Sequence, residues 1–358
     1  MARREDKVPL FWHTGIKAIP RRPDNPEAYP EDDARHWYDL EYAGWLVEKM
    51  PMPESPMDGP KGKKVAAILP GWHPYAEEFR RGMEDAARRV GMDLRVYSSP
   101  WDPEDQKHEV ERALSWEPHL VIIWIESLRG GSQLIETIYQ AGIPVVAANA
   151  PPDEAGLRHV LAWTGPDDWA QFRRLSGRFA ELMGFRGGYA IVCHMKDTPT
   201  FFARSWSVVT ELKETASEME LLAMASTDLD EEKTYRQVKV WLDEFGSRLQ
   251  GVVSADDERT QLGINRALDE AGRADIIRVA NGSTPTGIRL IREGGVDAIT
   301  FQLAEQDGAL PVKLAADWFS GLEIPPIRHL PVRILDAENI DLLVNRKDLV
   351  LDIDTDQL

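Results

Sequence analysis

Few residues in this sequence stand at spacings that could support catalysis or hold a metal ion. No two of the eight histidines, and no histidine with the one cysteine, are spaced as metal ligands usually are. Cys193 ends the apolar run Tyr189-Ala-Ile-Val-Cys193, which predicts a small buried core residue. The Walker A, GxGxxG, HExxH and GxSxG patterns are absent. The sequence therefore offers no positive sign of an enzyme, a metal site or a cofactor.

Residues suited to binding a small molecule gather instead in loops that follow predicted strands. The strand at 65–69 runs into Pro70-Gly-Trp-His-Pro-Tyr75, and the strand at 145–148 runs into Asn149. In open parallel sheets, ligands bind beyond the carboxyl ends of the strands. Aromatic rings and planar polar groups at these ends can stack on a small ligand and hydrogen-bond to it.

Two other classes of protein are disfavoured by the sequence: nucleic acid-binding proteins by its charge, and membrane-spanning proteins by its lack of long apolar runs. The 358 residues carry a formal net charge of -18, which disfavours binding to nucleic acid phosphates. No apolar run reaches the roughly 18 residues of a membrane-spanning helix.

The start, Met1-Ala-Arg-Arg, lacks the apolar centre of a secretory signal. We therefore expect either a cytoplasmic protein or an exported one whose signal has been removed.

Predicted strands and helices alternate in two successive runs, as in βαβ units with right-handed crossovers. In the first run we expect strands at 65–69, 94–97, 120–125 and 145–148, with helices at 79–90, 103–115 and 133–141. In the second run we expect strands at 189–193, 220–225, 251–254, 276–280 and 297–300, with helices at 167–183, 200–215, 231–245, 258–271 and 286–293. The pattern predicts an α/β protein with two doubly wound parallel sheets and a ligand in the cleft between them.

Residues 1–62 differ from the rest of the chain. They hold 9 of the 24 prolines, and a helix is expected near 32–50, where four aromatic residues lie. The segment 50–60 has the composition of a proline-stiffened linker. We expect an N-terminal arm that packs on one of the two units through its aromatic residues. The alternative is a surface for a signalling or other partner.

Five motifs in order resemble the ribose-binding branch of the type I periplasmic binding proteins. After the first strand and its loop, they are Gly82-Met-Glu-Asp-Ala-Ala87 with Gly91, Ala141-Gly-Ile-Pro-Val-Val-Ala-Ala-Asn149, Gly251-Val-Val-Ser-Ala-Asp-Asp257 with Leu262-Gly263, Val279-Ala-Asn-Gly-Ser283, and Ala298-Ile-Thr-Phe-Gln302. The resemblance covers about residues 63–335. It implies two lobes joined by a three-segment hinge. Lobe 1 comprises 63–165 and 303–333, lobe 2 comprises 166–302 and 334–358, and residues 1–62 form the arm.

The resemblance also implies which residues bind the ligand. They are Trp72, His73 and Tyr75 in the first loop, Asn149, Arg204 from the second lobe, Asp256 or Asp257, Asn281, and Gln302 at the hinge. A sugar offers apolar C–H faces to aromatic rings and a rim of hydroxyls to planar polar groups. A hydroxyl left unpaired in a dry site costs roughly 1–3 kcal/mol, which would give selectivity.

The sequence departs from the family pattern at two positions. Asn149 and Asn281 stand where the family has acids, and Ala150 stands where an arginine commonly follows. Ribose itself is therefore doubtful. The loss of both acids would suit a ligand that offers acceptors, or one whose negative charge is received by Arg204. The alternative for Arg204 is a surface salt bridge.

Several further residues have two open interpretations. Trp124 and Glu126 lie at the end of the third strand, so each could be buried or reach the cleft. Trp101 and Trp206 are weaker candidates for ligand contact.

The resemblance implies a monomeric periplasmic protein that delivers a sugar or polyol to the permease of an ABC transporter, with no cofactor and no nucleic acid partner. The first rival is a sensory receptor, because the long aromatic arm resembles the extension of the autoinducer-2 receptor of this superfamily. A LacI-type regulator would need a helix-turn-helix, and the proline-rich residues 1–60 lack two adjacent amphipathic helices. An enzyme on this fold is the last alternative.

Overall fold

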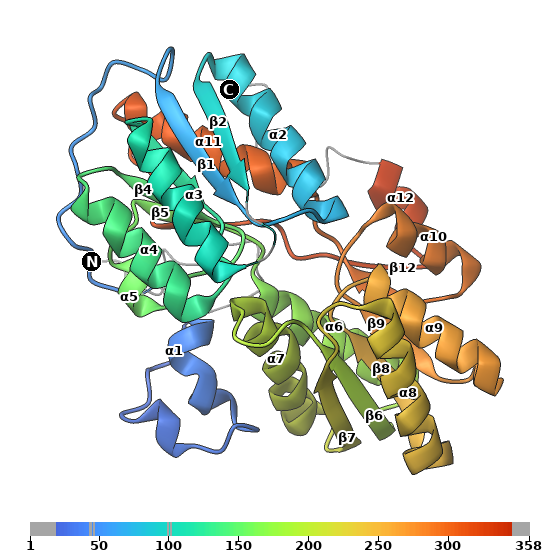
Figure 1. Cartoon of the computed structure of the whole chain (residues 1–358). Coiled ribbons are helices and arrows are strands. Elements are labelled where there is room, and N and C mark those ends of the chain that lie inside the picture. Colours follow the sequence, from blue (N-terminus) through green and yellow to red (C-terminus); the bar gives the residue numbers. More distant parts are fainter. Residues whose placement is uncertain (1–18, 43–44, 46, 99, 101, 346–358) are drawn as a thin grey trace.

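The predicted strands assemble into two six-stranded sheets (Figure 1). The structure is a computed structural model that describes residues 19–345 except 43, 44, 46, 99 and 101. The first sheet has the order β11-β5-β4-β3-β1-β2, and the second has the order β12-β10-β9-β8-β6-β7. Every paired strand is parallel except β12, which runs antiparallel to β10. The prediction of two doubly wound parallel sheets is confirmed.

The strands of the first sheet are β1 (Lys64–Leu69), β2 (Asp93–Ser98), β3 (Leu120–Ile123), β4 (Val145–Ala148), β5 (Ala162–Gly165) and β11 (Ile327–His329). Those of the second are β6 (Arg186–Cys193), β7 (Glu218–Ser226), β8 (Leu249–Ser254), β9 (Ile277–Ala280), β10 (Ala298–Thr300) and β12 (Ile334–Asp336). In β3 and β4 every residue is buried, because helices cover both faces of a parallel sheet.

The helices on the first sheet are α2 (Pro74–Val90), α3 (Pro103–Ser115), α4 (Leu128–Gln140), α5 (Glu154–Leu157) and α11 (Ala304–Phe319). Those on the second are α6 (Asp168–Met183), α7 (Pro199–Thr215), α8 (Glu231–Phe245), α9 (Arg259–Ala271), α10 (Pro285–Glu293) and α12 (Ile340–Asn345). Short turns η2 (Pro26–Ala28), η3 (Ala34–Trp37) and η4 (Gly246–Arg248) and the single-turn helix α1 (Tyr38–Glu41) complete the elements. In the described part of the chain, no helix is both long and apolar enough to cross a bilayer.

Helix boundaries follow from capping residues. The side chain of Asp102 accepts from the backbone of Glu104 at the start of α3, which satisfies one of the free N–H groups there. Gly91 ends α2 with φ 74°, a left-handed conformation that glycine adopts without a Cβ penalty. The structure starts α4 at Leu128, five residues before the predicted start at 133. Gly131 lies within this extra first turn and packs so tightly on Ile125 that a Cβ would collide with it.

The chain passes between the two sheets three times. It crosses from β5 to α6, from β10 to α11 and from β11 to β12. Helix α6 packs on β9 and β10 of the second sheet, whereas α11 packs on β4 and β5 of the first. These crossings lie near the predicted positions and make the three-segment connection.

The N-terminal arm first packs on helices of the second sheet. Trp37 is buried and stacks on Trp206, with 5.2 Å between ring centroids, and it also contacts Trp169 and Phe202. The predicted helix over 32–50 is wrong in extent, because among the described residues of this range helical structure covers only Ala34–Glu41. Trp206 therefore contacts the arm rather than the pocket, and Trp101 lies outside the described residues.

The same arm then runs along helices of the first sheet. The backbone N–H of Met50 donates to Arg158 O at 2.9 Å, and Gly59 N donates to Phe319 O at 3.0 Å. Because residues 51–57 form no helix or strand, the segment meets these helices as extended chain. The arm therefore contacts both halves of the molecule, as its path in Figure 1 shows.

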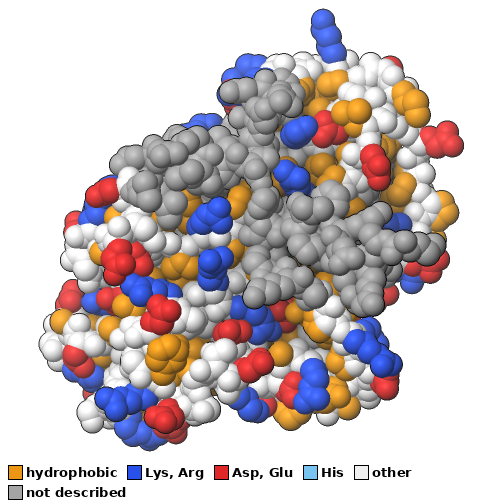
Figure 2. Space-filling view, turned by 180° about the vertical axis from the view of Figure 1, so that it is seen from behind, with side chains coloured by type: hydrophobic (Ala, Val, Ile, Leu, Met, Phe, Trp, Pro, Cys, Tyr) orange, Lys and Arg blue, Asp and Glu red, His pale blue; other side chains and the backbone are white. Residues whose placement is uncertain are grey.

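Charges of both signs are mixed over the surface. Figure 2 shows Lys and Arg side chains interspersed with Asp and Glu on the face seen from behind. Many form exposed pairs, such as Arg236–Glu232 at 2.9 Å. Such pairs contribute at most about 1 kcal/mol each, so the fold depends on its two cores rather than on them.

Replacing Gly82 by Ala should destabilise the protein. Helices α2 and α11 cross at Gly82 and Gly308, where a Cβ on Gly82 would collide with the backbone of Glu305. Forcing atoms into a packed contact costs typically 1–3 kcal/mol, about 2–8 °C in thermal midpoint. Gly177→Ala is the matched control, since a Cβ there meets nothing within 4 Å and adds helix propensity. An unchanged midpoint for Gly82→Ala would contradict the packing.

Candidate binding site

A pocket lies between the two sheets, where the carboxyl ends of their strands face each other. Its residues from the first sheet and its loops are His73, Tyr75, Trp124, Ile125, Glu126, Asn149 and Ala150. Its residues from the second sheet and the crossing are His194, Thr198, Pro199, Thr200, Arg204, Leu229, Asp256, Asp257, Asn281, Gly282, Thr284 and Gln302. Leu128 N donates to Asp197 O at 3.1 Å, so loops of the two halves are in contact beside the pocket.

The structure brings eight of the nine predicted residues to this one pocket. They are His73, Tyr75, Asn149, Arg204, Asp256, Asp257, Asn281 and Gln302. Trp124 and Glu126 line it as well.

Trp72 differs from the prediction. Its side chain is 72% exposed and does not line the pocket. The reason is local. His73 caps α2 and turns inward, which leaves the preceding residue on the outside of the loop.

His73 is held as a neutral imidazole with a known orientation. Its Nδ1 accepts from the backbone N–H of Tyr75 at 3.1 Å, which caps α2. Burial lowers the pKa of His73 to about 4, so the ring is uncharged near neutral pH. Because Nδ1 is the acceptor, the proton resides on Nε2, which can donate to a ligand.

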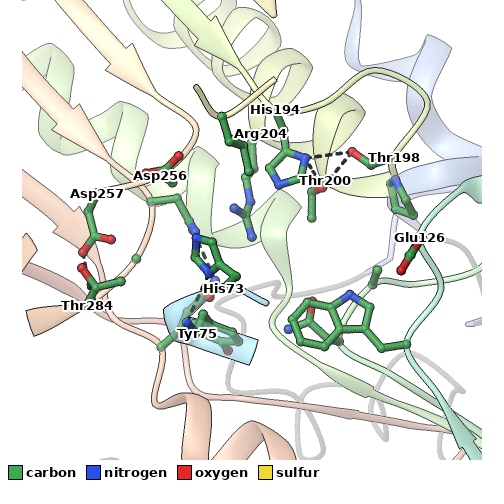
Figure 3. A pocket seen from close by; sticks show the side chains of 18 of the residues that line it. His73, Tyr75, Glu126, His194, Thr198, Thr200, Arg204, Asp256, Asp257 and Thr284 are labelled. Atoms are coloured by element: carbon green, nitrogen blue, oxygen red, sulfur yellow. Dashed lines mark hydrogen bonds between the residues drawn. The ribbon is translucent and has the colours of Figure 1, made fainter. Parts of the chain in front are cut away.

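Arg204 is already paired inside the protein. Its guanidinium donates to Asp168 at 3.2 and 3.4 Å and to the carbonyl of Ala255 at 3.0 Å. Burial raises the pKa of Asp168, while the charge and hydrogen bonds of Arg204 act in the opposite direction. Figure 3 shows Arg204 reaching from the second-sheet side toward His73 and Tyr75. The surface salt bridge is excluded, because Arg204 is only 8% exposed.

Asn281 and Gln302 continue this network. With its amide oxygen turned toward Arg204, Asn281 accepts from Nη1 at 2.8 Å, and its nitrogen donates to Thr300 at 2.8 Å. The amide nitrogen of Gln302 donates to Gln171 Oε1 at 2.5 Å. The planar groups on this wall are therefore fixed before any ligand arrives.

Asp256 and Asp257 both line the pocket, and they have different hydrogen-bond partners. Asp256 Oδ1 accepts from the backbone of Glu258 at 2.7 Å, and its Oδ2 makes no hydrogen bond within the described residues. Asp257 Oδ2 accepts from Thr284 N at 2.9 Å, joining the loops after β8 and β9 (Figure 3). A Cβ on Gly282 or Gly287 would collide with the Asp257 carboxyl, so glycines make room for it.

Some residues at the pocket were not predicted from the sequence. His194 lines the pocket, with Nδ1 3.0 Å from Thr198 Oγ1 and 3.1 Å from Thr200 Oγ1, and burial lowers its pKa well below the usual value. His194 directly follows β6, so the rule that ligands bind at strand ends could have found it. Asp168 and Asp307 lie behind pocket residues, and no sequence signal marks them.

Asp307 is buried at the start of α11 and binds two pocket residues from behind. Its Oδ2 accepts from Tyr75 Oη at 3.0 Å and from Asn149 Nδ2 at 2.6 Å. Burial raises the pKa of Asp307 to about 7, and these two hydrogen bonds oppose the rise. The family has an acid at the position of Asn149, and here a carboxyl group lies next to Asn149 but is supplied by Asp307 of α11.

The Asp257→Asn variant should gain stability relative to wild type as the pH rises. Burial, with the charge of Asp256, raises the pKa of Asp257 to about 8, whereas an unfolded Asp titrates near 3.9. Between these values the folded chain holds a proton that the unfolded chain releases, so the stability due to this carboxyl is full below pH ~4 and is lost toward pH 8. The advantage of Asp257→Asn in unfolding free energy should grow by ~1 kcal/mol per pH unit. Urea unfolding at several pH values measures it.

Asp275→Asn is the control for this measurement. Arg273 lowers the pKa of the exposed Asp275, so that carboxyl is ionised in both states above pH 5. Its effect should not change between pH 5 and 8. A constant difference between Asp257→Asn and wild type over this range would show that Asp257 is not held in its protonated form.

Comparisons with known proteins agree on one family. The profile of the family described as periplasmic binding protein domain matches residues 70–323. A xylitol-binding protein of Mycolicibacterium smegmatis is 21% identical over 287 residues, 79% of this chain and 79% of that protein.

Solved structures show the same fold. An ABC transporter solute-binding protein from Bacillus halodurans with bound myo-inositol has a TM-score of 0.72 and 21% identity, covering 79% of this chain and 97% of that one. The fructose-binding periplasmic domain of a hybrid two-component system has a TM-score of 0.73 and 16% identity, covering 82% of this chain and 96% of that one.

Proposed function

The chain belongs to the periplasmic binding protein family, and we propose that it captures a neutral sugar or polyol in the pocket and presents it to an ABC transporter. The observation that supports this most is the pocket itself. It combines aromatic side chains, Tyr75 and Trp124, with planar polar groups that are already fixed by hydrogen bonds. Members of this family are binding proteins, and no residue of the pocket is proposed as catalytic.

The charges in the pocket favour a neutral ligand over an acid. Three carboxyl groups, those of Glu126, Asp256 and Asp257, line it directly, and although Asp257 is mainly protonated near neutral pH, none of the three offers a positive charge to an acid. The one guanidinium that lines it is already bound to Asp168. A ligand carboxylate would have to compete with Asp168 for Arg204 and approach the other acids, so we do not retain the expectation that Arg204 receives a negatively charged ligand.

We propose that the two sheets are the lobes that close on the ligand. Lobe 1 would comprise 63–165 and 303–333, and lobe 2 would comprise 166–302 and 334–358, of which 346–358 lie outside the described residues. Motion would occur at the three crossings. We further propose that the protein acts as a monomer outside the cytoplasm, as the family implies, and binds no nucleic acid.

A thermal-shift screen tests the binding function. We expect at least one of xylitol, myo-inositol, D-fructose and D-allose to raise the thermal midpoint, and D-glucuronate not to. A ligand at 100 times its Kd stabilises the native state by about 2.7 kcal/mol, roughly 5–10 °C here. A flat response to a full library of sugars and polyols would overturn the proposal.

Two tryptophan variants give this screen an internal control. Trp124→Leu should remove the ligand-induced shift, because Trp124 lines the pocket. Trp318→Leu should keep it. Trp318 is equally buried, at 8% exposed, but it lies at the far end of α11, where its ring contacts that of Phe319 and its carbonyl accepts from Ser55 of the arm. Equal loss in both variants would mean that the shift does not report on the pocket.

A sensing role is the second candidate. One solved structure with this fold is the periplasmic domain of a hybrid two-component system. The arm also contacts both halves, so it could report their relative position to a partner.

Uptake by cells that lack the gene distinguishes the two roles. Transport predicts that accumulation of the labelled ligand falls to background and returns when the gene is restored. Sensing predicts normal accumulation together with loss of the ligand-induced transcriptional response.

A further inference from the structure

The first-sheet wall of the pocket has a fixed pattern of hydrogen-bond donors and acceptors, and Asp307 sets it. The side chain of Asp307 is fully buried and does not line the pocket. It reaches Tyr75 and Asn149, which do line the pocket, through a single oxygen. Its role is therefore one of positioning rather than of contact with the ligand.

Tyr75 can only accept from a ligand in this arrangement. A phenol has one O–H, and that of Tyr75 is donated to Asp307 Oδ2 at 3.0 Å. Burial raises the pKa of Tyr75 well above its usual value, so the phenol stays protonated and the bond persists. The atom left for the ligand is Oη, as an acceptor.

The Asn149 amide is oriented in the same way. Its Nδ2 donates to Asp307 Oδ2 at 2.6 Å, which turns Oδ1 away from Asp307. The backbone of Asn149 is also held in place, so the side chain cannot leave Asp307 by a backbone rotation. Asn149 has φ 57°, its N–H donates to Thr164 O at 2.7 Å, and its carbonyl accepts from Trp163 Nε1 at 3.2 Å. Asn is one of the few residues with a side chain that adopt this left-handed conformation.

His73 supplies a donor beside these acceptors. Its Nδ1 is used by the backbone of Tyr75, so Nε2–H faces outward from the helix cap. This wall therefore offers the Tyr75 and Asn149 oxygens as acceptors and one imidazole N–H as a donor. A hydroxyl group matches it, because a hydroxyl donates once and accepts as well. A carbonyl, an ether or a carboxylate only accepts, and would leave the acceptors unpaired.

We propose that Asp307 is a specificity-determining positioning residue that makes the first-sheet wall select a ligand hydroxyl acting as a donor. The proposal rests on the proposed function and narrows it to ligands with a free hydroxyl at this end. The carboxyl is essential to it. Above its pKa of about 7 the Asp307 carboxyl can only accept, whereas an amide at position 307 could donate as well, and the Asn149 amide could then turn its nitrogen to the ligand.

The test uses the best-binding sugar of the thermal-shift panel and its monodeoxyfluoro analogues. Each analogue replaces one hydroxyl by fluorine, which cannot donate. In wild type, calorimetric titration should show a loss of about 10–100-fold in affinity at the position that meets Tyr75 and Asn149, since an unpaired group costs about 1–3 kcal/mol. In Asp307→Asn the ratio at that position should fall toward one, with the ratios at other positions unchanged.

Two further variants keep the test decisive. Asp317 lies on the same helix as Asp307, and Asp317→Asn removes only its pairing with Lys313. The affinity ratios of this variant should therefore equal those of wild type. Tyr75→Phe removes one of the two acceptors, together with its hydrogen bond to Asp307, but keeps the carboxyl and its bond to Asn149, and it should lower the ratio at the same position. It serves as the test if Asp307→Asn does not fold.

The outcomes separate this inference from the proposed function. If no panel sugar binds the wild type, the proposed function fails and this inference fails with it. If a sugar binds but Asp307→Asn or Tyr75→Phe weakens it and all its analogues equally, Asp307 has a structural role only and the inference is overturned. An unchanged ratio in both variants overturns it as well.

Discussion

Carboxyl groups buried at the junction of the two sheets must find partners, and this requirement shapes the pocket. An isolated carboxylate in a dry interior is so costly that it is protonated or paired. Here Asp168 takes the Arg204 guanidinium, Asp257 takes a backbone N–H, and Asp307 takes a phenol and an amide. Three of these partners, Arg204, Tyr75 and Asn149, have side chains that also line the pocket, so satisfying the acids fixes what a ligand can meet.

The fold makes this arrangement possible. Parallel strands in two sheets deliver their carboxyl ends to one junction, so loops distant in sequence converge there. Close helix packing matters as much, since α2 and α11 approach at Gly82 and Gly308, which brings Asp307 within reach of Tyr75. The packing of α2 on α11 therefore contributes both to the stability of the first half and to the arrangement of hydrogen-bonding groups in the pocket.

Much of this was predictable from the sequence, and the failures have physical causes. The family resemblance led to eight pocket residues, and all of them except Arg204 in α7 lie in or next to loops that follow strands, where the edge of a parallel sheet faces the ligand. Trp72 failed because a cap at the next residue decides which way the loop turns. Asp307 was not predicted because its partners are set by helix packing, which leaves no trace in local spacing.

A crystal structure of the protein with a bound sugar or polyol would test the central claim most directly. We predict a neutral ligand between the sheets, with a hydroxyl within hydrogen-bond distance of Tyr75 Oη and Asn149 Oδ1 and with Arg204 still paired to Asp168. A ligand carboxylate on Arg204 with Asp168 displaced, or a ligand bound away from this pocket, would contradict it.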